Sequence, residues 1–235
     1  MDKETKRGLI ILLTIVIVIM TGLGIDAFMK YKNKFVYEEH LDDIALTVDE
    51  RSITLRELGY YVYTVEMQID KQARLYNPED PLDYWNTRFN NGVDGAYISE
   101  MAREAVFGTC ACDLIYEQMA AEAGYELSQE EKTSVEETAQ KLYDNMSGEQ
   151  KRKTGMTLEL AVEAGMRKAL VLKFASEYFD DVDFNGYSGY REELVSYSGD
   201  YYKKEILSKH DVQYETKIYD EMKLGRITTG YSVKY

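Results

Sequence analysis

The sequence predicts a mainly α-helical fold that carries a small two-stranded sheet and is preceded by one transmembrane helix. Apolar residues recur at intervals of three and four over most of the chain after residue 54, which is the spacing of amphipathic helices. Two short stretches, 44–48 and 227–235, alternate with period two and indicate strands. The expected organisation is a cytoplasmic tail at 1–7, a transmembrane signal anchor at 8–28, a stalk at 29–43 and an extracytoplasmic helical domain at 44–235.

The composition argues against nucleic acid as a partner. The 235 residues carry a formal net charge of −14, and an acidic surface repels phosphate backbones. The chain has only two prolines and no low-complexity tract. After the apolar N-terminal segment, enough residues remain for one domain with a real core.

The N-terminal segment from Gly8 to Gly24 contains no charged residue. At about 1.5 Å per residue it comes close to the roughly 30 Å of a bilayer core. Lys3, Lys6 and Arg7 precede it and are expected to stay in the cytoplasm, which places the bulk of the chain outside the cell membrane. A cleaved signal peptide is the competing interpretation.

The first part of the domain is expected to be a strand followed by a helix. Thr54 and Glu57 form a capping box, which typically opens a helix because each side chain binds a free backbone N–H at the helix start. The apolar stripe continues to Ala73, and the Asn77–Pro81 stretch ends it. A short helix is expected around Trp85.

The centre of the chain predicts two helices joined by a tight turn. Apolar residues from Met101 to Met119 form a stripe, and Gly124 suits the left-handed position after a helix. A second capping box, Ser128 to Glu131, starts another amphipathic helix that runs to Met146. We expect a helical hairpin against which the rest of the chain packs.

The last third is expected to hold further helices and a closing strand. Thr157 caps a helix that ends near Phe179, residues 180–189 form a loop, and residues 190–223 are helical with a break at 198–199. Because an isolated strand leaves its backbone groups unpaired, the strands at 44–48 and 227–235 are expected to pair with each other.

Several of these motifs resemble the SurA-like chaperones and PrsA-like foldases. The stretch Val48–Glu57 is similar to their opening strand, turn and helix start, although Glu50 replaces the usual turn glycine. Asp113–Gly124 followed by Leu127–Glu131 is similar to their long helix and the helix start after it. The resemblance covers roughly residues 44–180 and implies a peptide-binding chaperone. A parvulin-type isomerase domain is not expected, because too few residues follow and the chain's only histidines are His40 and His210.

The predicted function is a membrane-anchored holdase for unfolded or exported polypeptides, without prolyl isomerase activity. The alternative is a structural or scaffolding partner of a membrane or cell-surface complex. No catalytic motif is recognised, so an enzyme is not expected and no cofactor is required. The candidate peptide-binding residues are Tyr60, Tyr61, Tyr63 and Met67, which offer amphipathic and adaptable apolar surface; the alternative is plain core packing.

One loop matches the pattern of a calcium-binding EF-hand. Asp181, Asp183, Asn185, the backbone carbonyl of Tyr187 and a bidentate Glu192 occupy the ligand positions. The pattern predicts a weak Ca²⁺ site, although no second hand is present to pair with it. The alternative is a helix–helix loop with solvated carboxylates.

Overall fold

The computed structural model describes residues 35–89, 95–231 and 233, and residues 37–235 form one compact unit. Among the described residues, no helix is both long and apolar enough to cross a membrane. The tail expected at 1–7, the anchor expected at 8–28 and the first part of the stalk lie outside the described residues.

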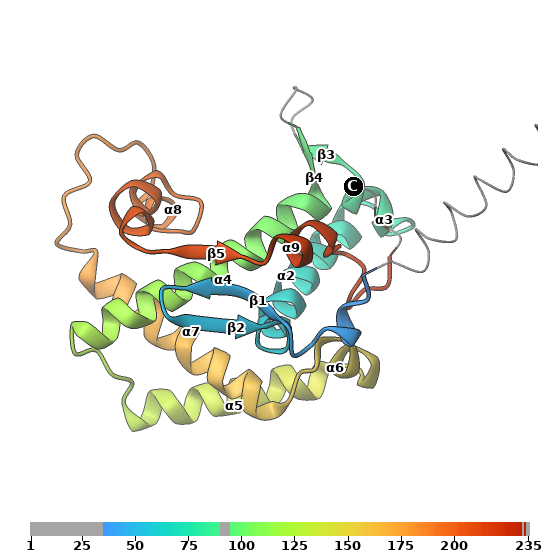
Figure 1. The fold of residues 1–235 in the computed structure, drawn as a ribbon, viewed down its shortest axis with the longest axis horizontal. Helices are drawn as coiled ribbons and strands as arrows, with labels where there is room; N and C mark the ends of the chain where they lie inside the picture. Colours follow the sequence, from blue (N-terminus) through green and yellow to red (C-terminus); the bar gives the residue numbers. More distant parts are fainter. Residues whose placement is uncertain (1–34, 90–94, 232, 234–235) are drawn as a thin grey trace, which may run out of the picture. The chain divides into compact units, whose positions relative to one another are not determined.

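The unit is mainly helical, as predicted (Figure 1). Its elements, in chain order, are η1 (Tyr37–Glu39), β1 (Ile44–Val48), β2 (Arg51–Thr54), α2 (Leu55–Tyr76), α3 (Pro81–Trp85), β3 (Arg88–Phe89), β4 (Ala96–Tyr97), α4 (Ile98–Glu122), α5 (Gln129–Asn145), α6 (Gly148–Thr154), α7 (Leu158–Tyr178), α8 (Arg191–Leu194), η2 (Tyr202–Ile206), η3 (Leu207–Lys209), β5 (Val212–Tyr214) and α9 (Thr216–Glu221).

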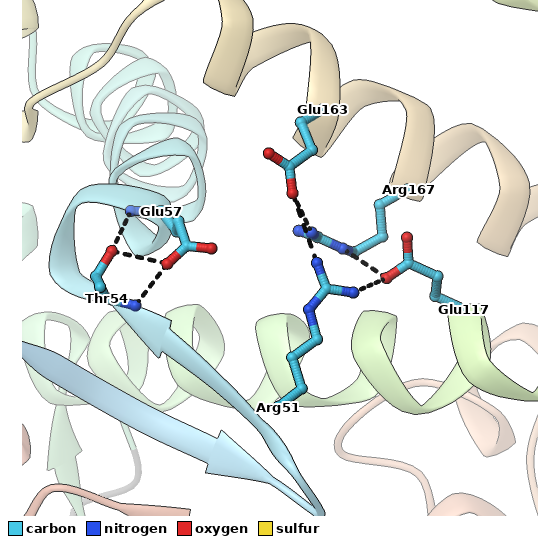
Figure 2. A network of polar contacts seen from close by, with 6 residues as sticks. All are labelled: Arg51, Thr54, Glu57, Glu117, Glu163 and Arg167. Atoms are coloured by element: carbon cyan, nitrogen blue, oxygen red, sulfur yellow. Dashed lines mark hydrogen bonds and ion pairs between the residues drawn. The ribbon is translucent and has the colours of Figure 1, made fainter.

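The predicted helix starts are confirmed. The Thr54 side chain accepts a hydrogen bond from the Glu57 backbone N–H, and the Glu57 carboxylate accepts from the Thr54 backbone N–H (Figure 2). The same reciprocal cap opens α5 at Ser128. The Thr157 side chain caps α7 by accepting from the Leu160 N–H at 3.2 Å. These local signals work because they satisfy backbone groups that every helix start leaves free.

The predicted packing of the second central helix against the first is wrong. Instead of folding back onto α4, α5 packs along α7, while α4 packs against α2, α7 and β1 (Figure 1). The stretch of α4 from Cys110 to Tyr116 is buried at every position, so its circumference is already covered. In α5, by contrast, Ala139 is the buried residue, and this narrow apolar face needs only one neighbour.

The predicted two-stranded sheet is also wrong. The sheet that contains β1 has three strands in the order β2-β1-β5, with β1 antiparallel to both neighbours, and β3 and β4 pair in a separate two-stranded sheet. Leu46 of β1 pairs with Ile53 of β2 and with Tyr214 of β5. The described residues between 227 and 235 do not form the strand that was expected there. Instead, β5 at 212–214 lies beside β1, in the position that was expected for the strand at 227–235.

The C-terminal segment has a different role, because it binds a buried carboxylate on α2. Glu66 is fully buried, and its Oε1 accepts backbone N–H groups from Gly225, Arg226 and Ile227 at 2.5, 3.1 and 3.2 Å. Its Oε2 accepts the Thr228 N–H at 2.5 Å and the Thr228 hydroxyl. Backbone donors that point at one carboxylate cannot also pair in a sheet ladder, so residues 225–228 curl around Glu66.

The turn between β1 and β2 is built without the glycine of the resembled family. Asp49 takes the left-handed conformation with φ +52°, which aspartate tolerates better than most residues. Its carboxylate accepts the Asp211 N–H at 2.9 Å and lies 2.7 Å from His210 Nδ1. The hydrogen bond with His210, followed by that with Asp211, lowers the pKa of the Asp49 carboxyl. The turn is therefore fastened to the chain just before β5.

Candidate functional site

The candidate site is a cleft of about 490 Å³ between α4, α7 and the segment that starts at α8. Cys112, Asp113 and Tyr116 line it from α4, and Lys168 and Leu172 line it from α7. Cys112 and Asp113 lie four and three positions before Tyr116, and Lys168 lies four positions before Leu172, so the lining residues of each helix share one face. Its third wall comes from residues 191–197, which comprise the short helix α8 and the three turn residues after it.

An ion pair lies in the wall of the cleft. Lys168 Nζ lies 3.0 and 3.3 Å from the two carboxylate oxygens of Asp113. The Asp113 side chain is 3% exposed, whereas that of Lys168 is 37% exposed. Burial raises the pKa of the Asp113 carboxyl, and the neighbouring Lys168 ammonium opposes that rise. The pair thus joins a buried anion to a half-exposed cation.

The remaining walls are mostly apolar. The Leu172 side chain is among the large apolar residues left exposed, at 59%, and it lies one turn along α7 from Lys168. The third wall is fastened to α4 by the Tyr116 hydroxyl, which donates to the Val195 carbonyl at 2.6 Å. Gly108 leaves room for the Tyr197 ring, since a Cβ built there would lie 2.4 Å from it. Tyr116 and Gly108 therefore hold the third wall against α4.

The charges of the cleft lining cancel. Besides Asp113 and Lys168, the charged lining residues are Arg191 and Glu192, which lie 3.6 Å apart. Arg191 also forms an ion pair with Asp180. The cleft is therefore electrically neutral although the chain as a whole is strongly acidic.

A second charge network fixes α4 and α7 beside the cleft (Figure 2). Glu117 follows Asp113 by one turn on α4, and its Oε2 lies 3.0 Å from Arg167 Nε on α7 and 2.6 Å from an Arg51 nitrogen of β2. Arg167 also lies 3.2 Å from Glu163, which Arg51 approaches to 3.5 Å. Because the Arg167 side chain is 4% exposed, this network is better shielded from solvent than an ordinary surface pair.

The predicted peptide-binding residues do not form an open apolar surface. Tyr61 and Tyr63 are buried, and Tyr60 and Met67 are half-buried. Tyr63, Tyr60 and Met67 pack in one apolar cluster with residues of the α5–α7 region, among them Ala139. The expectation of a free tyrosine surface is thus corrected to core and rim packing, because the helices that follow cover this face of α2. Binding of peptide by these residues stays a prediction.

The calcium loop is present as a loop, but its side chains contact other groups. Asp183 accepts the Asn185 N–H and its side-chain amide, both at 2.9 Å. The Tyr187 hydroxyl donates to Glu205 at 2.6 Å, and Glu192 lies beside Arg191. Within the described ranges no three His, Cys, Asp or Glu residues are grouped as a metal site. Calcium binding by Asp181 and its neighbours stays a prediction.

The cleft is not predicted by any motif of the sequence, although one residue signals it. Asp113 stands in the most apolar part of the central helix, between Cys112 and Leu114, where a charged residue needs a partner if it is buried. Comparison of the chain with models of known protein families, with curated proteins and with solved structures finds no match. The resemblance to SurA-like and PrsA-like proteins therefore stays a hypothesis.

Proposed function

We propose that this domain is a non-enzymatic peptide-binding chaperone that holds apolar segments of unfolded, exported polypeptides in the cleft between α4 and α7. The observation that carries the proposal is an open cleft of about 490 Å³ with largely apolar walls and an exposed Leu172. Its volume falls within the about 300–1,000 Å³ that ligand sites span. Covering an exposed leucine in a concave wall with another apolar side chain is favourable in free energy, because it removes apolar surface from water.

The charges of the molecule suit a promiscuous holdase. The four charged residues of the lining balance, so apolar contact can dominate the capture of a segment. The acidic surface outside the cleft keeps a complex with an unfolded client soluble. Because an extended client loses chain entropy on capture, binding of any one segment is expected to be weak.

A binding role also fits the chemistry of the only thiol in the lining. Burial raises the pKa of the Cys112 thiol, and a thiol that stays protonated is a poor nucleophile. The cleft residues that carry charge are already engaged in ion pairs with each other. We therefore propose capture without bond cleavage, without nucleotide and without prolyl isomerisation.

A scaffolding role is the second candidate, and a different surface favours it. Leu75 and Tyr76 at the end of α2 are 71% and 62% exposed, and Phe89 of β3 is 62% exposed. Large apolar side chains left open in this way are typical of contacts with a fixed partner.

The full-length chain in lipid nanodiscs, added at stoichiometric amounts without ATP, should slow the aggregation of an unfolded model protein. Leu172→Glu should abolish this protection, because it puts a charge into the apolar wall. Leu75→Glu is the matched control, since it changes an exposed leucine of another helix, and it should protect like the wild type. Equal aggregation with and without the wild-type chain would overturn the holdase proposal. Loss of a single co-purifying partner in Leu75→Glu alone would support the scaffold.

A further inference from the structure

The ion pair in the cleft wall is unequal, and this inequality bears on what the cleft selects. The Asp113 side chain is almost fully buried, while more than a third of the Lys168 side chain is exposed to solvent. Lys168 can therefore leave the pair and be hydrated with little movement. Asp113 cannot reach water in the same way, because α4 holds it among buried neighbours.

Two kinds of charged ligand would affect this pair differently. A cationic group that enters the cleft can take the place of Lys168 on Asp113, and the displaced ammonium moves into solvent. An anionic group that binds Lys168 would leave Asp113 buried without its cation, which is among the more costly changes in a protein interior. The exchange is therefore favourable for cations and unfavourable for anions.

We propose that the cleft selects segments in which a large apolar side chain stands next to an arginine or lysine, with Asp113 accepting the basic group in place of Lys168. This inference rests on the proposed function, because it names the class of segment that the holdase site prefers. Leu172 and Val171 contact the apolar side chain, and Asp113 receives the cation. Asp113 is one of the lining residues of the cleft, and both of its carboxylate oxygens contact the Lys168 ammonium, at 3.0 and 3.3 Å. A guanidinium can use two such oxygens at once.

The net negative charge of the molecule favours basic segments over acidic ones at longer range as well. A formal net charge of −14 attracts basic segments and repels acidic ones before contact is made. This general attraction is screened by salt, whereas the preference set by a buried carboxylate is screened much less. Salt dependence thus separates the contribution of Asp113 from that of the whole surface.

The test uses three short peptides that are identical except at one position beside a phenylalanine, which is arginine, glutamine or glutamate. Calorimetry with the full-length chain in nanodiscs, at about 0.15 M salt, should rank them in that order. The arginine peptide should bind about tenfold or more tightly than the glutamate peptide. Asp113→Asn keeps the shape of the side chain and should reduce this ratio to about that of non-specific attraction.

Glu137→Gln is the matched control, because it also removes one acid, but from the exposed face of α5 and outside the cleft lining. It should leave the ranking nearly intact. If all three wild-type affinities are equal, the selection is refuted while the peptide-binding proposal stands. If no peptide binds, the proposed function fails as well. Equal effects of Asp113→Asn and Glu137→Gln would assign the ranking to overall charge and overturn the role of Asp113.

Discussion

Replacing Glu66 with alanine should destabilise the domain more than any exposed substitution on the same helix. The fully buried carboxylate accepts four backbone N–H groups of residues 225–228 and the hydroxyl of Thr228. Burial raises the pKa of the Glu66 carboxyl, and the hydrogen bonds from Thr228 and its neighbours oppose that rise. Alanine would leave all of these donors without their acceptor.

The size of the effect follows from the donors that lose their partner. A buried donor left unsatisfied costs about 1–3 kcal/mol, and four backbone donors are involved, although the freed segment can recover part of this from water. We therefore expect a loss of at least about 3 kcal/mol in the free energy of unfolding. For a domain of about 150–250 residues this lowers the melting temperature by about 6–12 °C.

Denaturant unfolding of the full-length chain, followed by far-UV circular dichroism, measures this loss. Gln68→Ala is the matched control, because it lies two residues along α2 on an exposed position, and it should stay within about 0.5 kcal/mol of the wild type. Hydrogen exchange should show that Glu66→Ala removes protection from the amides of 225–228. An unchanged midpoint with unchanged protection would refute the role given to Glu66.

Three further outcomes are expected. Asp49→Asn should lower the free energy of unfolding above about pH 4. The difference from the wild type should vanish as the pH falls through the lowered pKa of Asp49, because protonation then removes the contact with His210 in the wild type too. A difference that does not change with pH in acid titrations would contradict this. Gly59→Ala should cost about 1–3 kcal/mol in chemical denaturation, since its Cβ would lie 2.6 Å from the Thr154 carbonyl oxygen, and a neutral result would show that α2 and α6 can separate freely. Calorimetry at millimolar Ca²⁺ should give heat that Glu192→Gln removes, and the absence of heat in the wild type would end the calcium hypothesis.

The sequence predicted the helices well where local chemistry decides them. The caps at Thr54, Ser128 and Thr157 each satisfy free backbone groups of their own helix, so their signal is complete within a few residues. The apolar stripe from Met101 to Met119 likewise predicted a helix, and it lies within α4. Such signals say that a face is apolar, but they do not say which element covers it. For this reason the pairing of α5 with α7 was missed.

The strand predicted at 44–48 is confirmed as β1, but the one predicted at 227–235 failed for a reason that lies far away in the chain. The alternation from Ile227 to Tyr235 is typical of a strand, but the acceptor that captures residues 225–228 is Glu66 on α2. The true partner of β1, Val212–Tyr214, is only three residues long and follows a helical stretch. A short strand of this kind carries little periodic signal of its own.

The candidate site was harder to predict than the fold because its third wall consists of the one-turn helix α8 and the turn that follows it. Asp113 and Lys168 come from two predicted helices, but their contact depends on how α4 and α7 cross. The wall at 191–197 is positioned by single contacts, such as that of Tyr116 with Val195, which no periodic pattern encodes. The chemistry of the α2 tyrosines suits peptide binding, but the sequence of α2 does not indicate which helices cover them.

Site-specific photo-crosslinking tests the central claim most directly, which is that unfolded segments bind between α4 and α7. A photoreactive residue placed at Leu172, in the cleft wall, is compared with one at Glu137, on the exposed face of α5. With an unfolded client and the full-length chain in nanodiscs, we predict a crosslinked adduct from position 172 and little from position 137. No adduct at 172, or equal yields at the two positions, would contradict binding in the cleft.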